Sequence, residues 1–217
     1  MNNIRFFVRT AGTRVLDSSY QQIDYTLLID QNRSPIDHFI SSLRKISDFD
    51  AVLLEDDLVL CNNFLSEIQN VIKSYPNRII NFFQNPYKAS PIEEKYDIWW
   101  NQCTYYPRGI AEKIADIMDG LERRKNGPKK NQYSYLESEA LRRLDIKLVQ
   151  YRPHLVQHKD FDTLLFDRTF NIRRSIYFID YLKKLGISYD EVKSHTAELR
   201  SLMELHFKEL QERNFNA

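Results

Sequence analysis

Short apolar runs and amphipathic segments alternate along the first part of the chain. IRFFV (4–8) and YTLLID (25–30) are rich in β-forming residues, and AVLLE (51–55) is a continuous apolar run typical of a strand buried on both faces. Between the second and third runs, Ser34 and Pro35 provide an N-cap and a first-turn proline for an amphipathic helix. This order of strands and helices predicts an open α/β sheet.

Coarser signals continue the alternation to about residue 160. Asn62 or Asn63 can cap a second helix, which Pro76 closes, and RIINFF (78–83) is the next expected strand. Beyond it we expect a strand within WWNQCTYY, helices from Gly109 to about Leu121 and within YSYLESEALRRL, and short extended pieces in IKLVQY and LVQH.

Two amphipathic helices are predicted in the last part of the chain. The first has its apolar positions within 176–185 and ends at Gly186, and the second has them within 192–210. We expect both helices to pack on the sheet. Residues 1–170 would then form the domain proper, and residues 171–217 its C-terminal helical extension.

The composition limits the class of protein. The chain has 217 residues, of which 42% are hydrophobic and 28% charged, with 5 Gly and 7 Pro, and this excludes disordered and collagen-like proteins. No apolar run approaches the length of about 18 residues that a membrane span needs, and the N-terminal segment lacks a signal-peptide core. We therefore expect a cytoplasmic protein, in which Cys61 and Cys103 are free thiols.

The charges are unevenly distributed although the net charge is only +1. Residues 1–120 carry an excess of acidic residues, and the remainder carries an excess of basic ones. Part of the basic excess lies in LERRKNGPKKN, whose Asn-Gly-Pro centre breaks a helix and predicts a basic loop. Such a loop either faces water or binds phosphate groups, and the sequence leaves both open. Its cationic residues are Arg123, Arg124, Lys125, Lys129 and Lys130.

Three consecutive carboxylates, Glu55, Asp56 and Asp57, end the apolar strand and precede the second helix. In open α/β sheets ligands bind at the carboxyl ends of strands, so this position suits a site. Adjacent acids repel one another, and a divalent cation makes such an arrangement favourable. The alternative is that the acids only form the turn at the end of the strand.

The segment LLEDDLVLCNNFLSEI resembles the acidic motif of GT-A-fold glycosyltransferases, in which a strand ends in Glu-Asp-Asp or Asp-x-Asp. The resemblance is to small viral and lipooligosaccharide-type members, covers residues 4–166, and implies a single Rossmann-like open mixed sheet flanked by helices. Other segments that resemble the family, in the same order, are RTAGTR, LLIDQNRSP, CTYYPRGIAEKI, LESEALRRL and PHLVQHKDFDTLLF.

This resemblance implies a transferase that takes a sugar from a nucleotide sugar, most commonly a UDP sugar. A bound Mn²⁺ or Mg²⁺ would neutralise the diphosphate leaving group. Asp57 is then the first metal ligand, and His158 adds a nitrogen ligand, which suits Mn²⁺ better than Mg²⁺. Asp56 and Glu55 are expected to face the ribose and to order the loop.

Three residues near strand ends are placed to bind the nucleotide. Thr10 and Arg14 follow the first strand, and Asp30 ends the second. A purely structural role is the alternative for each of them.

An inverting transfer needs a carboxylate that removes the proton from the attacking hydroxyl. Glu137 and Glu139 lie in the helix that the resemblance assigns to this base, and we prefer Glu137. Residues two apart on a helix do not share a face, so at most one of them points into the site. Ser138 stands where the family has Asp, which is a departure from its pattern.

The acceptor is expected to meet aromatic and basic side chains. Trp99, Trp100 and Tyr106 offer flat faces that can stack on a sugar or a base, with burial in the sheet core as the alternative. The basic loop and the absence of a membrane anchor favour hydroxymethylpyrimidine in DNA as the acceptor, as in bacteriophage enzymes that would act in the host cytoplasm. A cell-surface glycan such as lipooligosaccharide or capsule is the competing acceptor.

Two other classes of function compete with the glycosyltransferase. A metal-dependent phosphoryl-transfer enzyme could use the same three acids. A non-catalytic interaction module would instead use the amphipathic C-terminal helices.

Overall fold

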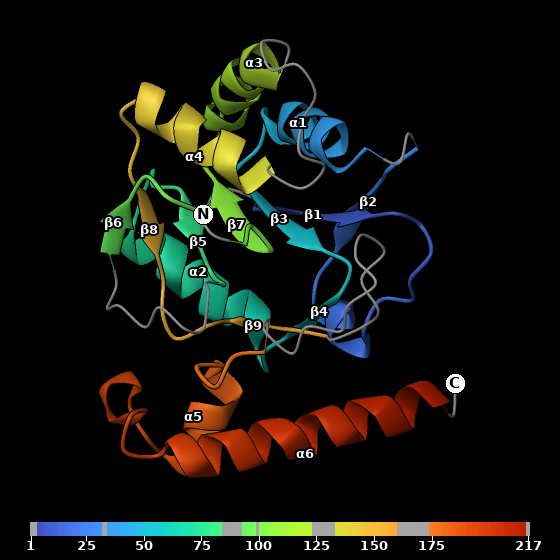
Figure 1. The fold of residues 1–217 in the computed structure, drawn as a ribbon, viewed down its shortest axis with the longest axis vertical. Coiled ribbons are helices and arrows are strands. Elements are labelled where there is room, and N and C mark those ends of the chain that lie inside the picture. The colour runs from blue at the N-terminus through green and yellow to red at the C-terminus, as the bar shows by residue number, and fades with distance from the viewer. Residues whose placement is uncertain are drawn as a thin grey trace.

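The computed structural model describes residues 4–31, 34–83, 93–98, 100–122, 133–159 and 174–215. Its centre is an open, mixed, seven-stranded sheet with helices on both faces (Figure 1). The predicted α/β class is therefore confirmed, with the Rossmann-like layering of helix, sheet and helix.

The parallel strands place their carboxyl ends at one edge of the sheet. β1 pairs in parallel with both β2 and β3, whereas β7 runs antiparallel between β3 and β5. The sheet order is β2-β1-β3-β7-β5-β8-β6. The strands of this sheet are β1 (Arg5–Thr10), β2 (Tyr25–Ile29), β3 (Ala51–Glu55), β5 (Ile80–Asn81), β6 (Glu93–Lys95), β7 (Cys103–Tyr106) and β8 (Leu148–Gln150).

The helices divide between the two faces, because neighbouring residues of each strand point to opposite sides. Phe7 and Leu53 belong to the core beneath α1, α3 and α4, and Val8 and Leu54 belong to the core beneath α2 and α5. Figure 1 shows the first group above the sheet and α5 below it. The helices are α1 (Pro35–Ile46), α2 (Phe64–Ser74), α3 (Ile110–Glu122), α4 (Tyr133–Arg143) and α5 (Ile179–Leu185).

A second, two-stranded sheet lies beside the first. β4 (Leu58–Leu60) pairs antiparallel with β9 (Val156–His158), so that Leu58 stands opposite His158. The sequence indicated LVQH as an extended piece, but it did not indicate a strand directly after the three acids. A 3-10 helix, η1 (Ser18–Gln22), packs against β4, and Leu60 N of β4 donates a hydrogen bond to Ser19 Oγ of η1 at 2.9 Å.

Two local predictions are corrected by the structure. The run 78–83 is strand only over Ile80–Asn81, because the chain then leaves the ladder. Asn63 precedes α2, but its backbone is left-handed (φ 58°) and its side chain does not cap the helix. The first amides are bonded instead by distant side chains, with Phe64 N donating to Gln22 Oε1 at 3.1 Å.

The C-terminal residues pack on the same core as the sheet. Tyr177, Phe178 and Leu199 belong to the cluster that contains β1 and β3, and Phe207 and Leu210 pack on Val59 of β4. After α5 come a 3-10 helix, η3 (Tyr189–Glu191), and the long helix α6 (Thr196–Phe215), which crosses the lower end of the molecule in Figure 1.

Two expectations from composition can be compared with the described residues. Cys61 and Cys103 are both buried free thiols, as expected. In the described ranges, no helix combines the length and apolar character that a membrane crossing requires.

Candidate active site

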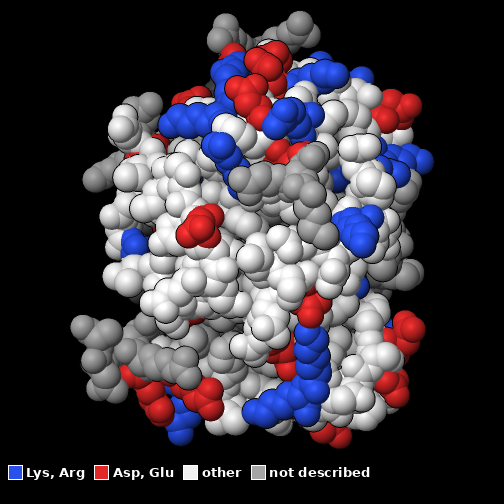
Figure 2. All heavy atoms as spheres, turned by 180° about the vertical axis from the view of Figure 1, so that it is seen from behind, with Lys and Arg blue, Asp and Glu red and all other residues white. Residues whose placement is uncertain are grey.

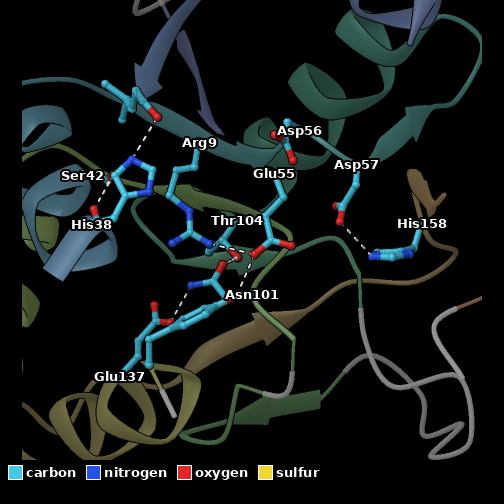
Figure 3. Close-up of polar contacts among 12 residues, drawn as sticks. Arg9, His38, Ser42, Glu55, Asp56, Asp57, Asn101, Thr104, Glu137 and His158 are labelled. Carbon is cyan, nitrogen blue, oxygen red and sulfur yellow. Dashed lines mark hydrogen bonds and ion pairs between the residues drawn. The ribbon is translucent and has the colours of Figure 1, made fainter. Parts of the chain in front are cut away.

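The three consecutive acids point in three different directions from the carboxyl end of β3. Figure 3 shows Glu55 turned toward α4, Asp57 turned toward His158, and Asp56 lying between them on the far side of the strand. Successive residues of a strand point to opposite faces, which separates Glu55 from Asp56. The chain then turns before β4, which separates Glu55 from Asp57. Glu55 therefore has partners of its own, whereas Asp56 and Asp57 share Arg14.

Glu55 lies in a buried ion pair on the α4 side of the sheet. Arg9 Nη2 donates to Glu55 Oε1 at 2.7 Å, and the Tyr133 hydroxyl donates to the same oxygen at 2.6 Å. The Arg9 guanidinium lies against the rings of Phe39 and Tyr133, at 4.7 and 4.9 Å from their centroids. Glu55 thus ties β3 to the start of α4, and its expected contact with a ribose stays a prediction.

Asp56 connects the acidic segment to the loop after β1. Thr10 Oγ1 donates to Asp56 Oδ2 at 2.6 Å, and Arg14 Nη1 donates to Asp56 Oδ1 at 3.0 Å. Thr10 Oγ1 also accepts the Gly12 amide at 2.8 Å, which fixes the turn that carries Arg14. The structure therefore brings together Thr10, Arg14 and Asp56, which the sequence had assigned to the donor nucleotide.

Asp57 and His158 meet although they are far apart in the sequence. The pairing of β4 with β9 places His158 Nε2 3.2 Å from Asp57 Oδ2, and Lys159 N donates to Asp57 O at 2.7 Å. Arg14 Nη1 lies 2.7 Å from the same Asp57 oxygen. Both Asp57 and His158 are almost fully buried, at 5% and 2% exposure. Figure 3 shows their side chains facing one another.

The chemistry of this pair fits a divalent cation. Two neighbouring ligands of an octahedral cation with bonds of about 2.1 Å lie about 3 Å apart, close to the observed 3.2 Å. A carboxylate oxygen with an imidazole nitrogen suits Mn²⁺. Among the described residues no group of three or more His, Cys, Asp or Glu forms a complete cage. Substrate phosphates would therefore supply further ligands, as is usual for such cations.

Glu137 lies on α4, away from Asp57 and His158, inside a network of hydrogen bonds. The Tyr106 hydroxyl donates to Glu137 Oε1 at 2.6 Å, and Asn101 Nδ2 donates to Glu137 Oε2. Thr104 Oγ1 donates to Asn101 Oδ1 at 2.6 Å and accepts from Asn81 Nδ2 at 3.0 Å. All of these side chains are buried, and the network fixes the Glu137 carboxyl with two donors.

Burial raises the pKa of Glu137 to about 7, against hydrogen bonds from Tyr106 and Asn101 and the charge of Arg9, which lower it. Tyr106 remains a proton donor, because burial and the neighbouring Glu137 raise its pKa well above that of a free phenol. A carboxyl with a pKa near neutrality can both take and return a proton at physiological pH. This is the property that a general base requires.

Glu139 lies on the surface of the same helix. It pairs with Arg143 at 3.0 Å and with Arg142 at 3.3 Å, and these ion pairs lower its pKa. The structure therefore separates the two candidate bases, with Glu137 toward the sheet and Glu139 away from it.

The remaining predicted residues are placed as follows. Asp30 follows β2 and is half-buried, with its amide donating to Thr10 O at 2.8 Å. Trp100 is half-buried and stacks on Phe83. Tyr106 has no exposed surface, so its ring is part of the core and does not form a face for an acceptor. Trp99, Arg123, Arg124, Lys129 and Lys130 lie outside the described residues.

Several polar residues of this region were not singled out from the sequence. Arg9, Asn101 and Tyr133 lie on the α4 side of the sheet near its carboxyl edge, and the backbone of Gln102 lies beside the end of β3. A signal existed for Arg9, since it shares a strand face with Phe7 and a charged residue at an inward position needs a buried partner. The other three have side chains common in loops and caps, so no pattern marked them.

Comparisons with known proteins give distant likenesses. No protein-family model and no curated protein matches the chain. Among solved structures, A197 from STIV is similar over 71% of this chain and 83% of its own, with 13% identity and a TM-score of 0.42. CTP:phosphocholine cytidylyltransferase from Streptococcus pneumoniae is similar over 76% of this chain and 96% of its own, with 9% identity and a TM-score of 0.45. Likenesses at this distance carry no information on function.

Proposed function

We propose that this chain is a metal-dependent glycosyltransferase that moves a hexosyl group from a nucleotide sugar to an acceptor hydroxyl. The observation that carries the proposal is the meeting of Asp57 and His158 beside Arg14, at the carboxyl edge of an open α/β sheet. Such edges bind nucleotides, and this one combines two candidate ligands for a cation with a guanidinium that can bind phosphate.

The donor would be held on the side of the three acids. Asp57 and His158 would hold Mn²⁺ or Mg²⁺, which neutralises the charge that develops on the diphosphate when the sugar leaves. Arg14 would bind diphosphate oxygens from its partly exposed position, and Asp56 and Thr10 would fix the loop that carries it. Asp30, at the end of β2, would bind the nucleoside.

Glu137 would act as the base on the acceptor side. As the bond between the sugar and the diphosphate breaks, the acceptor oxygen bonds to the anomeric carbon and its proton passes to Glu137. Each carboxylate oxygen has two lone pairs, so each can accept a bond beyond those from Tyr106 and Asn101. Glu137 has no exposed surface in this structure, so transfer requires the acceptor to open a path to it.

The test of the proposal is turnover of a panel of nucleotide sugars. We expect at least one UDP, GDP, CDP or TDP sugar to be hydrolysed slowly when Mn²⁺ is present, with release of its nucleoside diphosphate. In this reaction a water molecule takes the place of the acceptor hydroxyl. Addition of EDTA should stop the release. Hydrolysis of simple phosphodiesters or nucleoside triphosphates, with no turnover of any nucleotide sugar, would favour a phosphoryl-transfer enzyme instead.

We further propose hydroxymethylpyrimidine in DNA as the acceptor, on the basis of the basic loop in the sequence. Figure 2 shows a face on which basic and acidic side chains are intermixed at both ends and the middle is largely uncharged. The described residues of that face form no continuous basic surface, so they add no basic patch to the charges of the loop. A cell-surface glycan needs no such attraction and is the alternative acceptor.

Salt dependence of binding separates the two acceptors. Binding to hydroxymethylated duplex DNA should weaken steeply with salt, and replacing the four cations Arg123, Arg124, Lys129 and Lys130 by Ala should reduce the slope by up to about 4. A matched variant replaces Lys73, Arg78, Lys183 and Lys184, which lie away from that loop in the sequence, and should keep the slope. Absence of DNA binding at low salt would contradict a DNA acceptor and favour the glycan.

A further inference from the structure

Gln102 directly precedes β7, at the carboxyl edge of the sheet. Its backbone carbonyl accepts the Glu55 amide at 3.0 Å, which places it beside the end of β3. The residue before it, Asn101, donates to Glu137, and Thr104, two residues after it, donates to Asn101 Oδ1 in the same network. Gln102 is 2% exposed.

The amide oxygen of Gln102 is buried and accepts no hydrogen bond from the residues that the structure describes. The side chain of Asn101, its neighbour in sequence, is bonded, since it donates to Glu137 and accepts from Thr104. A buried amide oxygen without a donor lowers stability, so it is rarely kept unless something else supplies the donor. A ligand that carries hydroxyl or N–H groups would supply it.

The unbonded oxygen determines which part of a donor molecule can lie here. An amide oxygen needs a hydrogen-bond donor, and an ionised diphosphate has none to give. A sugar ring has several hydroxyl donors and an apolar face. The chemistry therefore points to the sugar and not to the phosphates.

Trp100, two residues earlier, offers a surface for an apolar ring face. Its indole is half-buried and stacks on Phe83, with ring centroids 6.3 Å apart and an angle of 26° between the planes. Its backbone has φ 64°, a conformation that is unfavourable for a tryptophan and so indicates that its placement is used. Gln102 N donates to Trp100 O at 3.0 Å, so the two residues belong to one turn.

We propose that Gln102 accepts a hydrogen bond from a hydroxyl of the transferred sugar, and that the turn from Trp100 to Gln102 selects which hexose the enzyme uses. This inference rests on the proposed function and adds a residue that determines specificity. It predicts an unusual combination of effects. Removing the amide should make the unliganded protein more stable and should weaken its binding of the nucleotide sugar.

The test compares Gln102→Met with Gln157→Met. Gln157 of β9 is equally buried, but its amide is fully bonded, with Nε2 donating to Ser175 O at 2.7 Å and Oε1 accepting from Ser175 N at 2.8 Å. We expect Gln102→Met to raise the melting temperature by about 3 °C and Gln157→Met to lower it by at least as much.

Binding then distinguishes a ligand contact from a structural one. Calorimetry should give Gln102→Met the wild-type affinity for the free nucleoside diphosphate, with an affinity for the nucleotide sugar reduced about 10-fold. Gln157→Met should leave the ratio of the two affinities unchanged. An unchanged ratio in Gln102→Met, or a lower melting temperature, would overturn the proposal. If Gln102→Met does not fold, the same ratio is measured in Gln102→Ala.

A failure of the proposed function is recognised separately. If the wild type binds none of the nucleotide sugars, methyl glucoside, methyl galactoside and methyl N-acetylglucosaminide are tested for thermal stabilisation of the wild type and of Gln102→Met. Stabilisation of the wild type alone would support a sugar contact at Gln102. Absence of stabilisation by all three would contradict it.

Discussion

Replacing Glu137 by Gln is expected to lower the rate of sugar transfer by about 10²–10⁴-fold, with little change in donor binding. The amide has nearly the same shape as the carboxylate but cannot take a proton from the acceptor hydroxyl. Donor binding should persist because the metal and phosphate groups would be held by Asp57, His158 and Arg14 on another part of the sheet edge. The measurement is the transfer rate at saturating donor, together with the dissociation constant of the nucleoside diphosphate.

Glu139→Gln is the matched control, because Glu139 lies two residues away on α4 and pairs with exposed charges. Its ion pairs with Arg142 and Arg143 are open to solvent, so their loss should change stability little. Transfer by this variant should equal that of the wild type. Wild-type transfer by Glu137→Gln combined with loss in Glu139→Gln would move the role of base to Glu139.

The pH profile adds a second readout on the same residue. Because burial raises the pKa of Glu137 to about 7, the ionised base is lost as the pH falls through that value. Transfer should therefore decline below about pH 7 and not near pH 4.5, the range of an ordinary glutamate. A rate that stays constant down to pH 5 would show that Glu137 does not supply the base.

Replacing Asp57 by Ala is expected to abolish metal-dependent binding of the donor. Mutation of a residue that merely hydrogen-bonds a metal ligand costs about 10–100-fold in metal affinity, so loss of the ligand itself should cost more than about 100-fold. Arg14 keeps its bond to Asp56 in the variant, so the loop after β1 should stay folded. The measurement is the rise in melting temperature on adding Mn²⁺ with UDP, which should vanish.

Asp17→Ala provides the control for loss of a carboxylate near the same strand pair. Asp17 forms an ion pair with Lys159 at 2.8 Å, directly after His158, but it is not among the proposed ligands. This variant should lose stability and still respond to Mn²⁺ with UDP. An undiminished response of Asp57→Ala would show that the three acids are not the metal site.

Much of the fold could be predicted because its signals are local. The strand AVLLE and the Ser34-Pro35 helix start appear in the structure at the expected positions, since apolar runs and caps act over a few residues. The strand at 58–60 was missed because its three residues carry too little pattern. The cap expected at Asn63 failed because Gln22, distant in sequence, bonds the helix amide instead.

The candidate site could be predicted in its residue types but not in its partnerships. Asp57 and His158 were paired through a resemblance, and the structure shows how the antiparallel pairing of β4 with β9 brings them together. The separation of Glu55 from Asp57 depends on the turn after β3 and on Arg9, which no short-range pattern encodes. The unbonded amide of Gln102 is a property of packing, so only a three-dimensional structure shows it.

The most direct test of a metal-dependent nucleotide site at Asp57 and His158 is calorimetric titration of the wild-type chain. UDP, GDP, CDP and TDP are titrated in the presence of Mn²⁺ and again in the presence of EDTA. We expect one nucleoside diphosphate to bind with Mn²⁺ and its affinity to fall by more than about 100-fold when the metal is removed. Equal binding with and without metal, or no binding of any of the four, would contradict a metal-dependent nucleotide-sugar site at Asp57 and His158.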